Sequence, residues 1–318
     1  MNGAKSRLSG IRALRAKYLS WHVWLSRFLS VFRYVFLMSV AIVFLFPFLF
    51  MFITSITSPL DLADPTVTWI PRVFFWQNYA IAFNLLNYAT GMRNSAVMVS
   101  VATLGHLFSC SFIAYGFARY RFPFRRVLFM LVVLSIIVPV QTLIITQYRF
   151  YASMGFINSI VPLLLPTFFG YGLRGALYIF IFRQFYLSMP KELEDAAEVD
   201  GCGGLRTFFR IILPASRSSM VVCAVLSIVW HWNDYYEPNI YLNELRKWPV
   251  TSMLPEMYIR INNKEAYDAI IGSGADFVGI NEGVTMAATV LVILPVLLAF
   301  FFIQRQFMQG VERSGIVE

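Results

Sequence analysis

Long stretches of the chain carry almost no charge and consist mainly of aliphatic and aromatic side chains. A helix needs about 20 apolar residues to cross ~30 Å of hydrocarbon. Six stretches come close to this length, and each is expected to form a transmembrane helix. They are Tyr34–Thr54, Asn94–Ala118, Val127–Tyr148, Phe150–Leu173 with a continuation past Arg174 to Phe182, Ser218–Asn233 and Gly283–Gln304. The pattern predicts an all-α, polytopic membrane protein with six transmembrane helices.

The third and fourth stretches almost touch, so a hairpin is expected at Ala152–Asn158 with Gly155 at its turn. Five prolines fall inside the predicted spans, at Pro47, Pro139, Pro162, Pro166 and Pro295. Proline is tolerated in membrane helices where neighbouring groups satisfy the freed carbonyls. We therefore expect kinks at these positions, with hinges as the alternative.

Composition supports this class of protein and excludes others. Of the 318 residues, 58% are hydrophobic and only 14% are charged, against about 25% charged in a typical soluble domain. Disorder requires low hydrophobicity and high charge, so it is excluded. A secreted disulfide scaffold is excluded as well, because the chain has only three Cys.

The distribution of Lys and Arg predicts the orientation in the membrane. Segment 1–33, loops 119–126 and 183–217 and the tail after 304 together hold 18 of them, whereas the opposite side holds seven. Basic residues collect on the cytoplasmic side. Both termini are therefore expected to face the cytoplasm, with the chain crossing the membrane several times. The net charge of +9 is explained by this topology and by anionic lipid, without a nucleic-acid partner.

Three regions follow from these patterns: residues 1–33, the six-helix membrane domain 34–304 and the tail 305–318. The first is a basic amphipathic segment without acidic residues. It is expected to lie at the cytoplasmic membrane surface, with docking to a partner protein as the alternative.

The residue types that carry enzymatic chemistry are sparse. The three His and three Cys show no metal-ligand spacing, so no metal site is expected. The Gly-rich segment 201–207 lacks the Gly-Lys-Ser/Thr ending of a phosphate-binding loop. We therefore expect neither an enzyme nor a cofactor bound by this chain; if ATP and Mg²⁺ are used, partner subunits hold them.

The loop between the fourth and fifth spans is the most informative segment. Pro190 suits a helix start, and acidic residues follow it in the first turn. Gly201 permits the turn that ends this helix, and a second, apolar stretch then runs to Pro214. The loop 190–214 is thus predicted to form a short helix–turn–helix at the membrane surface.

This loop resembles the EAA loop of binding-protein-dependent ABC importer permeases, which reads Glu-Ala-Ala, three residues, Gly, nine residues, Ile, any residue, Leu-Pro. The chain has Asp195-Ala196-Ala197, then Gly201, Ile211 and Leu213-Pro214 at the same spacing, with Asp in place of Glu. More widely, the chain is similar to the second permease of the maltose-type carbohydrate importers. The similar residues are Gln77-Asn78-Tyr79, Phe83, Asn94-Ser95, Ala114–Arg119, Pro139, Gln141, Asn158-Ser159, Trp232-Asn233-Asp234, Arg305 and Gly310.

The resemblance implies that loop 190–214 is a coupling helix seated on a separate ATPase. The residues implied in this contact are Glu194, Asp195, Ala196, Ala197, Asp200, Gly201, Ile211, Leu213 and Pro214. The implied partners are a second homologous permease subunit, two ATPase subunits and a periplasmic or extracellular solute-binding protein. The implied cargo is a sugar or oligosaccharide, and the implied location is the inner membrane of a bacterium.

Sugars are commonly held by aromatic faces together with amide or hydroxyl groups. Candidates for the substrate path are Gln141, Tyr148, Tyr171, Trp230, Trp232 and Asn233, with helix packing or an interfacial aromatic belt as the alternative for each. An ion-coupled secondary transporter remains the alternative function. It predicts inverted repeats and more intramembrane carboxylates, and neither is seen in the sequence.

Overall fold

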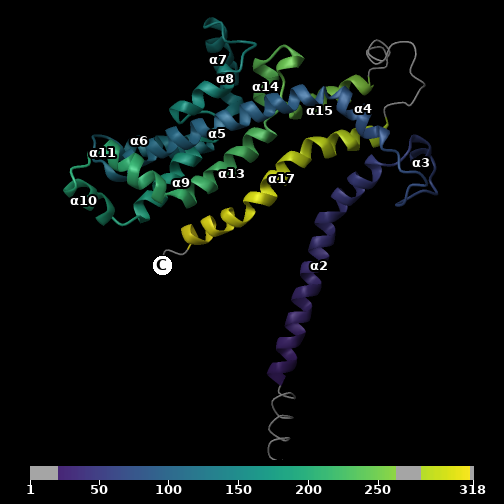
Figure 1. Ribbon diagram of the computed structural model, residues 1–318, viewed down its shortest axis with the longest axis horizontal. Helices are drawn as coiled ribbons and strands as arrows, with labels where there is room; N and C mark the ends of the chain where they lie inside the picture. Colours follow the sequence, from purple (N-terminus) through teal and green to yellow (C-terminus); the bar gives the residue numbers. More distant parts are fainter. Residues whose placement is uncertain (1–20, 263–280, 316–318) are drawn as a thin grey trace, which may run out of the picture.

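The computed structural model describes residues 21–262 and 281–315, and the regular structure in these ranges is helical. Four helices lie side by side and form the body of the molecule (Figure 1): α5 (Tyr88–Arg119), α9 (Gly175–Ser188), α13 (Arg217–Asn233) and α17 (Glu282–Gly315). The second and sixth predicted spans are confirmed as α5 and α17. The fifth is helical as α13, which has 17 residues and meets the length of a span only together with residues 204–215. Helix α17 continues as far as Gly315, so most of the predicted tail 305–318 is helical.

Helix α5 lies at the centre of the bundle because its side chains are small. Ala102, Ser109 and Ala114 are buried along it, and Gly91 and Gly105 bring neighbouring segments against its backbone. In membranes, where lipid is as apolar as leucine, such small residues allow the close packing that holds helices together. The helix contacts α9 and α13 along much of its length.

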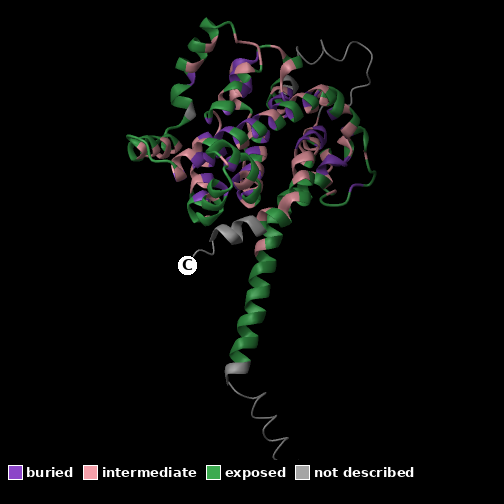
Figure 2. Ribbon diagram, turned by 60° about the vertical axis from the view of Figure 1, so that its left-hand side comes forward, coloured by how far each residue is buried: buried purple, intermediate pink, exposed green. Residues whose placement is uncertain are grey.

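The first predicted span is confirmed within α2 (Trp21–Ser55), which projects away from the bundle and is exposed along its length (Figures 1 and 2). Its 35 residues extend over roughly 50 Å, well beyond the ~30 Å hydrocarbon core. From Trp21 onward the predicted surface segment 1–33 is continuous with this span, and residues 1–20 lie outside the described ranges.

The third predicted span, Val127–Tyr148, is wrong as a single helix. The chain forms α6 (Arg125–Ile137) and α7 (Val140–Ser153), and the two axes meet at 104°. The break falls at Val138-Pro139, where both residues adopt extended backbone angles. Proline disfavours a helical conformation in the residue before it, so the apolar run bends here. The predicted turn at Gly155 is confirmed, with φ of 74°.

The fourth predicted span, Phe150–Leu173 with its continuation to Phe182, is also wrong as a single helix. It consists of α8 (Val161–Leu164), the 3-10 helix η1 (Leu165–Phe169), a tight turn and then α9. Pro162 and Pro166 lack backbone N–H groups, and Gly170 and Gly172 have positive φ. Ser109 of α5 replaces the lost backbone partners: its Oγ donates to Thr167 O at 2.6 Å and accepts from Gly170 N at 3.1 Å.

These breaks change the number of spans. In the described ranges, Trp24–Ser55, Tyr88–Arg119 and Glu282–Met308 are each long and apolar enough to cross a membrane. Two bent pairs, α6 with α7 and residues 204–215 with α13, raise the number to five if each pair is one span. The predicted six continuous helices are therefore replaced by a bundle in which two apolar segments, 125–153 and 161–188, are interrupted.

Shorter helices close the end of the bundle that is remote from loop 190–214 (Figure 1): α3 (Pro59–Ala63), α4 (Gln77–Leu85) and α15 (Val250–Asn262). Asn78 of α4 is fully buried, and its Nδ2 donates to Ser55 O and Thr57 O, each at 3.0 Å. This amide joins α4 to the end of α2. A core of buried residues from α4, α5, α13, α15 and α17 fills this end.

A polar cluster, the Asn158 clasp, joins the turn after α7 to η3 (Leu245–Lys247) and consists of Asn158, Glu244, Arg246 and Lys247. Asn158 Nδ2 donates to Glu244 Oε1 at 2.6 Å, and Lys247 Nζ donates to Asn158 O at 2.8 Å. Glu244 forms ion pairs with Arg246 and Lys247. These contacts, led by the Arg246 hydrogen bond, lower the pKa of Glu244 to about 2.

Candidate functional site

The predicted helix–turn–helix of loop 190–214 is confirmed. We call this segment the elbow: it comprises α10 (Glu192–Val199), α11 (Gly204–Thr207), the π-helix η2 (Phe208–Ile212) and α12 (Leu213–Ala215). It connects α9 to α13 and lies at one end of the bundle (Figure 1). Three carboxylates, Glu192, Glu194 and Asp195, stand in the first turn of α10, where the helix dipole favours negative charge.

Gly201 forms the bend of the elbow. Its φ of 77° lies in the left-handed region, which residues with a Cβ seldom adopt. Cys202 N donates to Ala197 O at 2.8 Å and Gly201 N donates to Glu198 O at 2.9 Å, a pattern typical of glycine-terminated helices. The bend therefore depends on glycine for its backbone conformation, although the space around the α-carbon is open.

An ion pair fixes α10 to the central helix. Arg119 Nε at the end of α5 lies 2.6 Å from Glu194 Oε1, and their side chains are only 6% and 20% exposed. Arg119 Nη2 also donates to Met189 O at 2.9 Å, just before the elbow. Glu194 thus points into its own chain. The sequence grouped it with the outward-facing residues, because a motif of adjacent acids does not reveal which one turns inward.

The remaining elbow residues divide into an outer and an inner set. Asp195, Ala196, Asp200, Gly201 and Pro214 are exposed, whereas Ala197 is buried. Phe208 and Ile212 are fully buried against α5 and α9, in a cluster that includes Tyr115 and Tyr186. Ile211 and Leu213 are partly buried beside the same cluster. The outer surface of the elbow therefore combines small residues and carboxylates with the exposed apolar side chains of Val199 and Leu205, and its inner side is firmly packed.

The structure brings two of the substrate-path candidates together. Tyr171, in the turn before α9, accepts a hydrogen bond at its hydroxyl from Gln147 Nε2 of α7 at 2.6 Å. Tyr241 donates to the other amide atom of Gln147 at 3.3 Å, and its ring is stacked with that of Tyr148. Gln147 was not predicted, because a lone amide on an apolar helix gives no distinctive sequence signal.

Trp230 lies beside the same turn. The guanidinium of Arg174 sits 4.1 Å from the centre of the Trp230 ring, a cation–π distance. Arg174 itself has φ of 64°, a conformation that costs roughly 1–3 kcal/mol for a residue other than glycine. Strain of this kind persists where the surroundings require it and is frequent at functional positions.

The other three candidates lie elsewhere. Trp232 is buried in the core shared by α4, α5, α15 and α17. Asn233 Nδ2 donates to Val229 O of its own helix at 2.8 Å. Gln141 is exposed near the start of α7. Side-chain direction within a helix decides these placements, and the sequence pattern did not determine it.

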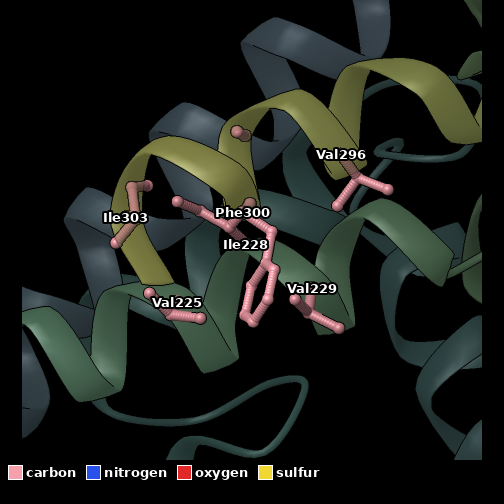
Figure 3. Close-up of a pocket in the computed structure, with 7 residues that line it drawn as sticks. Val225, Ile228, Val229, Val296, Phe300 and Ile303 are labelled. Atoms are coloured by element: carbon pink, nitrogen blue, oxygen red, sulfur yellow. The ribbon is translucent and has the colours of Figure 1, made fainter. Parts of the chain in front are cut away.

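An apolar hollow separates α13 from the last part of α17 (Figure 3). It is lined by Val225, Ile228, Val229, Val296, Ala299, Phe300 and Ile303. Because these side chains offer no hydrogen-bonding group, the hollow does not suit a sugar. The aromatic and polar groups around Tyr171 suit one better. No group of metal-binding side chains occurs in the described part of the chain.

Interrupted apolar helices with an elbow at one end of the bundle are typical of a polytopic transport protein, and the comparisons agree. Residues 110–313 match the family described as binding-protein-dependent transport system inner membrane component. The match includes α9, the elbow, α13 and α17 and covers more than half of the chain. The chain belongs to this family and is a permease subunit of an ATP-driven importer.

Several relatives match nearly end to end. The glycerol-3-phosphate permease protein UgpE of Yersinia enterocolitica is 27% identical over 91% of this chain and 98% of its own length. The polygalacturonan/rhamnogalacturonan permease protein YtcP of Bacillus subtilis is 27% identical over 90% and 96%. The lactose permease protein LacG of Rhizobium radiobacter is 28% identical over 88% and 94%.

The fold is also similar to a solved structure. A chain from a bacterial ABC transporter involved in the import of the acidic polysaccharide alginate superposes with a TM-score of 0.74. The alignment covers 88% of this chain and 97% of that one, at 21% sequence identity. The interrupted helices described above thus belong to a fold that is found in a transporter.

Proposed function

We propose that this chain forms one half of the membrane channel of an importer whose cargo is a carbohydrate or a carbohydrate-derived solute. A solute-binding protein delivers the cargo, a second permease subunit completes the channel, and two ATPase subunits bind ATP and Mg²⁺. The names of the relatives support this cargo class, since they include a lactose permease, a polygalacturonan permease and a glycerol-3-phosphate permease.

The elbow carries the coupling part of this proposal. Its outer surface combines small residues, Ala196 and Gly201, with the carboxylates of Asp195 and Asp200, which suits a close contact with a basic cleft on another protein. Its inner side is tied to α5 by the Arg119–Glu194 ion pair. A push on the outer surface is therefore transmitted to the central helix. A two-state transport cycle needs such a stiff link between a ligand-driven motor and the channel.

Orientation follows from the same assignment. If the elbow contacts an ATPase, it faces the cytoplasm, and the surplus of Lys and Arg on its side of the membrane agrees with this. The C-terminal part of α17 lies toward the elbow's end of the bundle (Figure 1). Both chain termini then lie in the cytoplasm, and the Asn158 clasp lies on the outer face.

The experiment is to purify the chain from its native membrane and identify what accompanies it. An ATPase subunit, a second permease and ATP-dependent solute uptake by the reconstituted complex are expected. Uptake by the isolated chain on an ion gradient, with no companions, would instead establish a secondary transporter. Replacing Asp195 by Lys tests the elbow separately from membrane insertion. This variant should enter the membrane, but little ATPase subunit should co-purify with it.

A further inference from the structure

Within the described ranges, Arg174 forms no ion pair with a carboxylate. The four ion pairs within the described ranges involve Arg72, Arg119, Arg246 and Lys247. Arg174 contributes only the cation–π contact with Trp230, and its side chain lies on the exposed face of the molecule. An arginine of this kind on a soluble surface would need no explanation, but its depth in the membrane makes it unusual.

Two helices give the depth of this arginine independently. Arg174 precedes α9, whose 14 residues separate it from the elbow by roughly 21 Å. Trp230 lies 13 residues after Arg217 along α13, which is roughly 20 Å from the other end of the elbow. The hydrocarbon core is ~30 Å thick, so the Arg174–Trp230 pair lies well within it.

A charged side chain at this depth needs water, a counter-ion or a polar cavity around it. The turn that carries Arg174 is not helical, and irregular backbone at membrane depth occurs where it is buried in protein or lines a water-filled cavity. Tyr171 of the same turn is 51% exposed, so the turn is not fully enclosed by this chain. These observations favour a water-filled cavity at the exposed face of the turn.

The groups next to Arg174 fit a polar, ring-shaped ligand. Trp230 and Tyr171 offer partly exposed aromatic faces. Tyr148 is linked to Gln147 through Tyr241, whose ring stacks on that of Tyr148 and whose hydroxyl donates to Gln147 Oε1. The Gln147 amide and the Tyr171 hydroxyl add hydrogen-bonding groups. Arginine binds carboxylates and phosphates through its planar fork of N–H donors. Arg174 and Tyr171 thus belong to one turn, and each contacts a further group: Arg174 contacts the Trp230 ring, and Tyr171 contacts the Gln147 amide.

We propose that Arg174, Trp230, Tyr171 and Gln147 form a subsite for the carboxylate or phosphate group of an anionic carbohydrate on its way through the membrane. The inference rests on the proposed function and narrows its cargo to solutes that carry negative charge. Depth argues against a lipid headgroup as the source of the anion, because headgroups lie outside the hydrocarbon core.

The first experiment measures the electrostatic potential at the turn and needs no knowledge of the natural cargo. In the complete complex, with Cys110, Cys202 and Cys223 replaced by Ala, Tyr171→Cys serves as a reporter thiol. Its reaction rates with an anionic and a cationic methanethiosulfonate are compared in phosphatidylcholine vesicles and again with anionic lipid added. Tyr148→Cys is the second reporter, in case Tyr171→Cys disturbs the turn.

A unit charge about 8 Å away changes the ratio of the anionic to the cationic rate roughly fivefold at low salt. Arg174→Gln should lower this ratio by about that factor, equally in both lipids. Arg93→Gln, roughly 20 Å from the turn along α5, should leave it unchanged. The proposal is overturned if neither reporter thiol reacts. It is also overturned if Arg174→Gln leaves the rate ratio unchanged, which would mean that a group on another subunit neutralises the charge of Arg174. An effect of Arg174→Gln that appears only with anionic lipid overturns it as well.

The second experiment tests selectivity by competition in the same complex. Trigalacturonate and its methyl ester share one skeleton and differ in charge. If the acid inhibits uptake at least tenfold more strongly than the ester, and Arg174→Gln but not Arg93→Gln removes the difference, the subsite is supported. Equal inhibition by both, or no inhibition by either, refutes the anionic preference. ATP-dependent sugar uptake that persists in that case would leave the proposed function standing.

Discussion

Arg119 and Glu194 are 75 residues apart in the sequence, yet their charged groups meet at 2.6 Å where the central helix α5 reaches the elbow. Neither Arg119 Nε nor Glu194 Oε1 has another hydrogen-bond partner in the described part of the chain. Each of these two atoms is therefore satisfied by the ion pair and by no other described group. Of the two adjacent acids in the elbow, Glu194 anchors the elbow to α5. Asp195 is exposed and can contact a partner protein.

Glu194→Gln should destabilise the chain because it leaves Arg119 largely buried without a counter-charge. Breaking a buried pair costs about 3–5 kcal/mol, and partial exposure of Glu194 reduces the expected loss to roughly 2–3 kcal/mol. Thermal unfolding of the detergent-purified complex measures it. Asp195→Asn is the matched control and should leave stability unchanged while weakening recovery of the ATPase.

The double variant Arg119→Met/Glu194→Leu separates charge from shape, since apolar replacement of both partners of a buried pair is often nearly neutral for stability. It should regain most of the lost stability but still show ATP hydrolysis poorly coupled to uptake. Normal coupling in this variant would mean that the ion pair is a packing feature without a part in transmission.

Gly201→Val should abolish uptake and weaken assembly with the ATPase while leaving membrane insertion intact. A β-branched residue is strongly disfavoured at φ of 77°, so the elbow must refold around it. Gly203→Val is the control: its φ is −73°, and nothing lies within 4 Å of an added Cβ at either position. Uptake assays on both variants decide the matter; equal activity would contradict a role for the bend.

Gly105→Ala should disturb the contact between α5 and η1. An added Cβ would lie 2.3 Å from Thr167 Oγ1 and 3.2 Å from the Phe168 ring, and Thr167 is fully buried. Overpacking of this kind costs about 1–3 kcal/mol. Gly116→Ala on the same helix meets nothing within 4 Å and should be neutral or stabilising by up to ~1 kcal/mol. Melting temperatures of the two variants test the difference.

The Asn158 clasp should lose stability in acid. Its folded state holds the pKa of Glu244 at about 2, below the ordinary value of 4.5 for a glutamate side chain. A carboxyl whose pKa is lowered by folding stabilises the protein above its unfolded pKa, and this contribution disappears as pH falls from about 4.5 to 2. Glu244→Gln should therefore melt at a lower temperature than the native chain at pH 7 and at nearly the same temperature near pH 2. A constant difference across that range would disprove the assignment.

The sequence predicted α2, α5 and α17 well because each is a long, uninterrupted apolar run, and length alone identifies such spans. It failed at the third and fourth spans because hydrophobicity carries no information on where a helix stops inside a membrane. Pro139, Pro162 and Pro166 marked the breaks, but proline also occurs in continuous membrane helices. The contacts of Ser109 with Thr167 and Gly170, which satisfy the backbone of the interrupted fourth segment, come from a distant helix and are not visible in the sequence pattern.

The candidate site likewise has parts that the sequence predicts and parts that depend on distant contacts. Spacing of Asp195, Gly201 and Pro214 predicted the elbow, because a motif with fixed gaps fixes the local backbone. The inward direction of Glu194 was not predictable, since its partner Arg119 comes from a distant segment. Among the aromatic candidates, Trp230 and Trp232 are two residues apart, and the rotation between them on α13 sends one to the exposed face and the other into the core.

The interrupted segment 161–188 also constrains how the protein is made. Its turn satisfies its polar backbone through Ser109 and, at Tyr171 O, through His106 at 3.1 Å, and both residues belong to α5. Lipid offers no substitute for these hydrogen bonds. The ribosome delivers α5 first, so the scaffold already stands in the bilayer when the broken segment emerges. A permuted chain that placed 161–188 ahead of 88–119 would expose the turn to hydrocarbon during synthesis, and quality control would remove much of it.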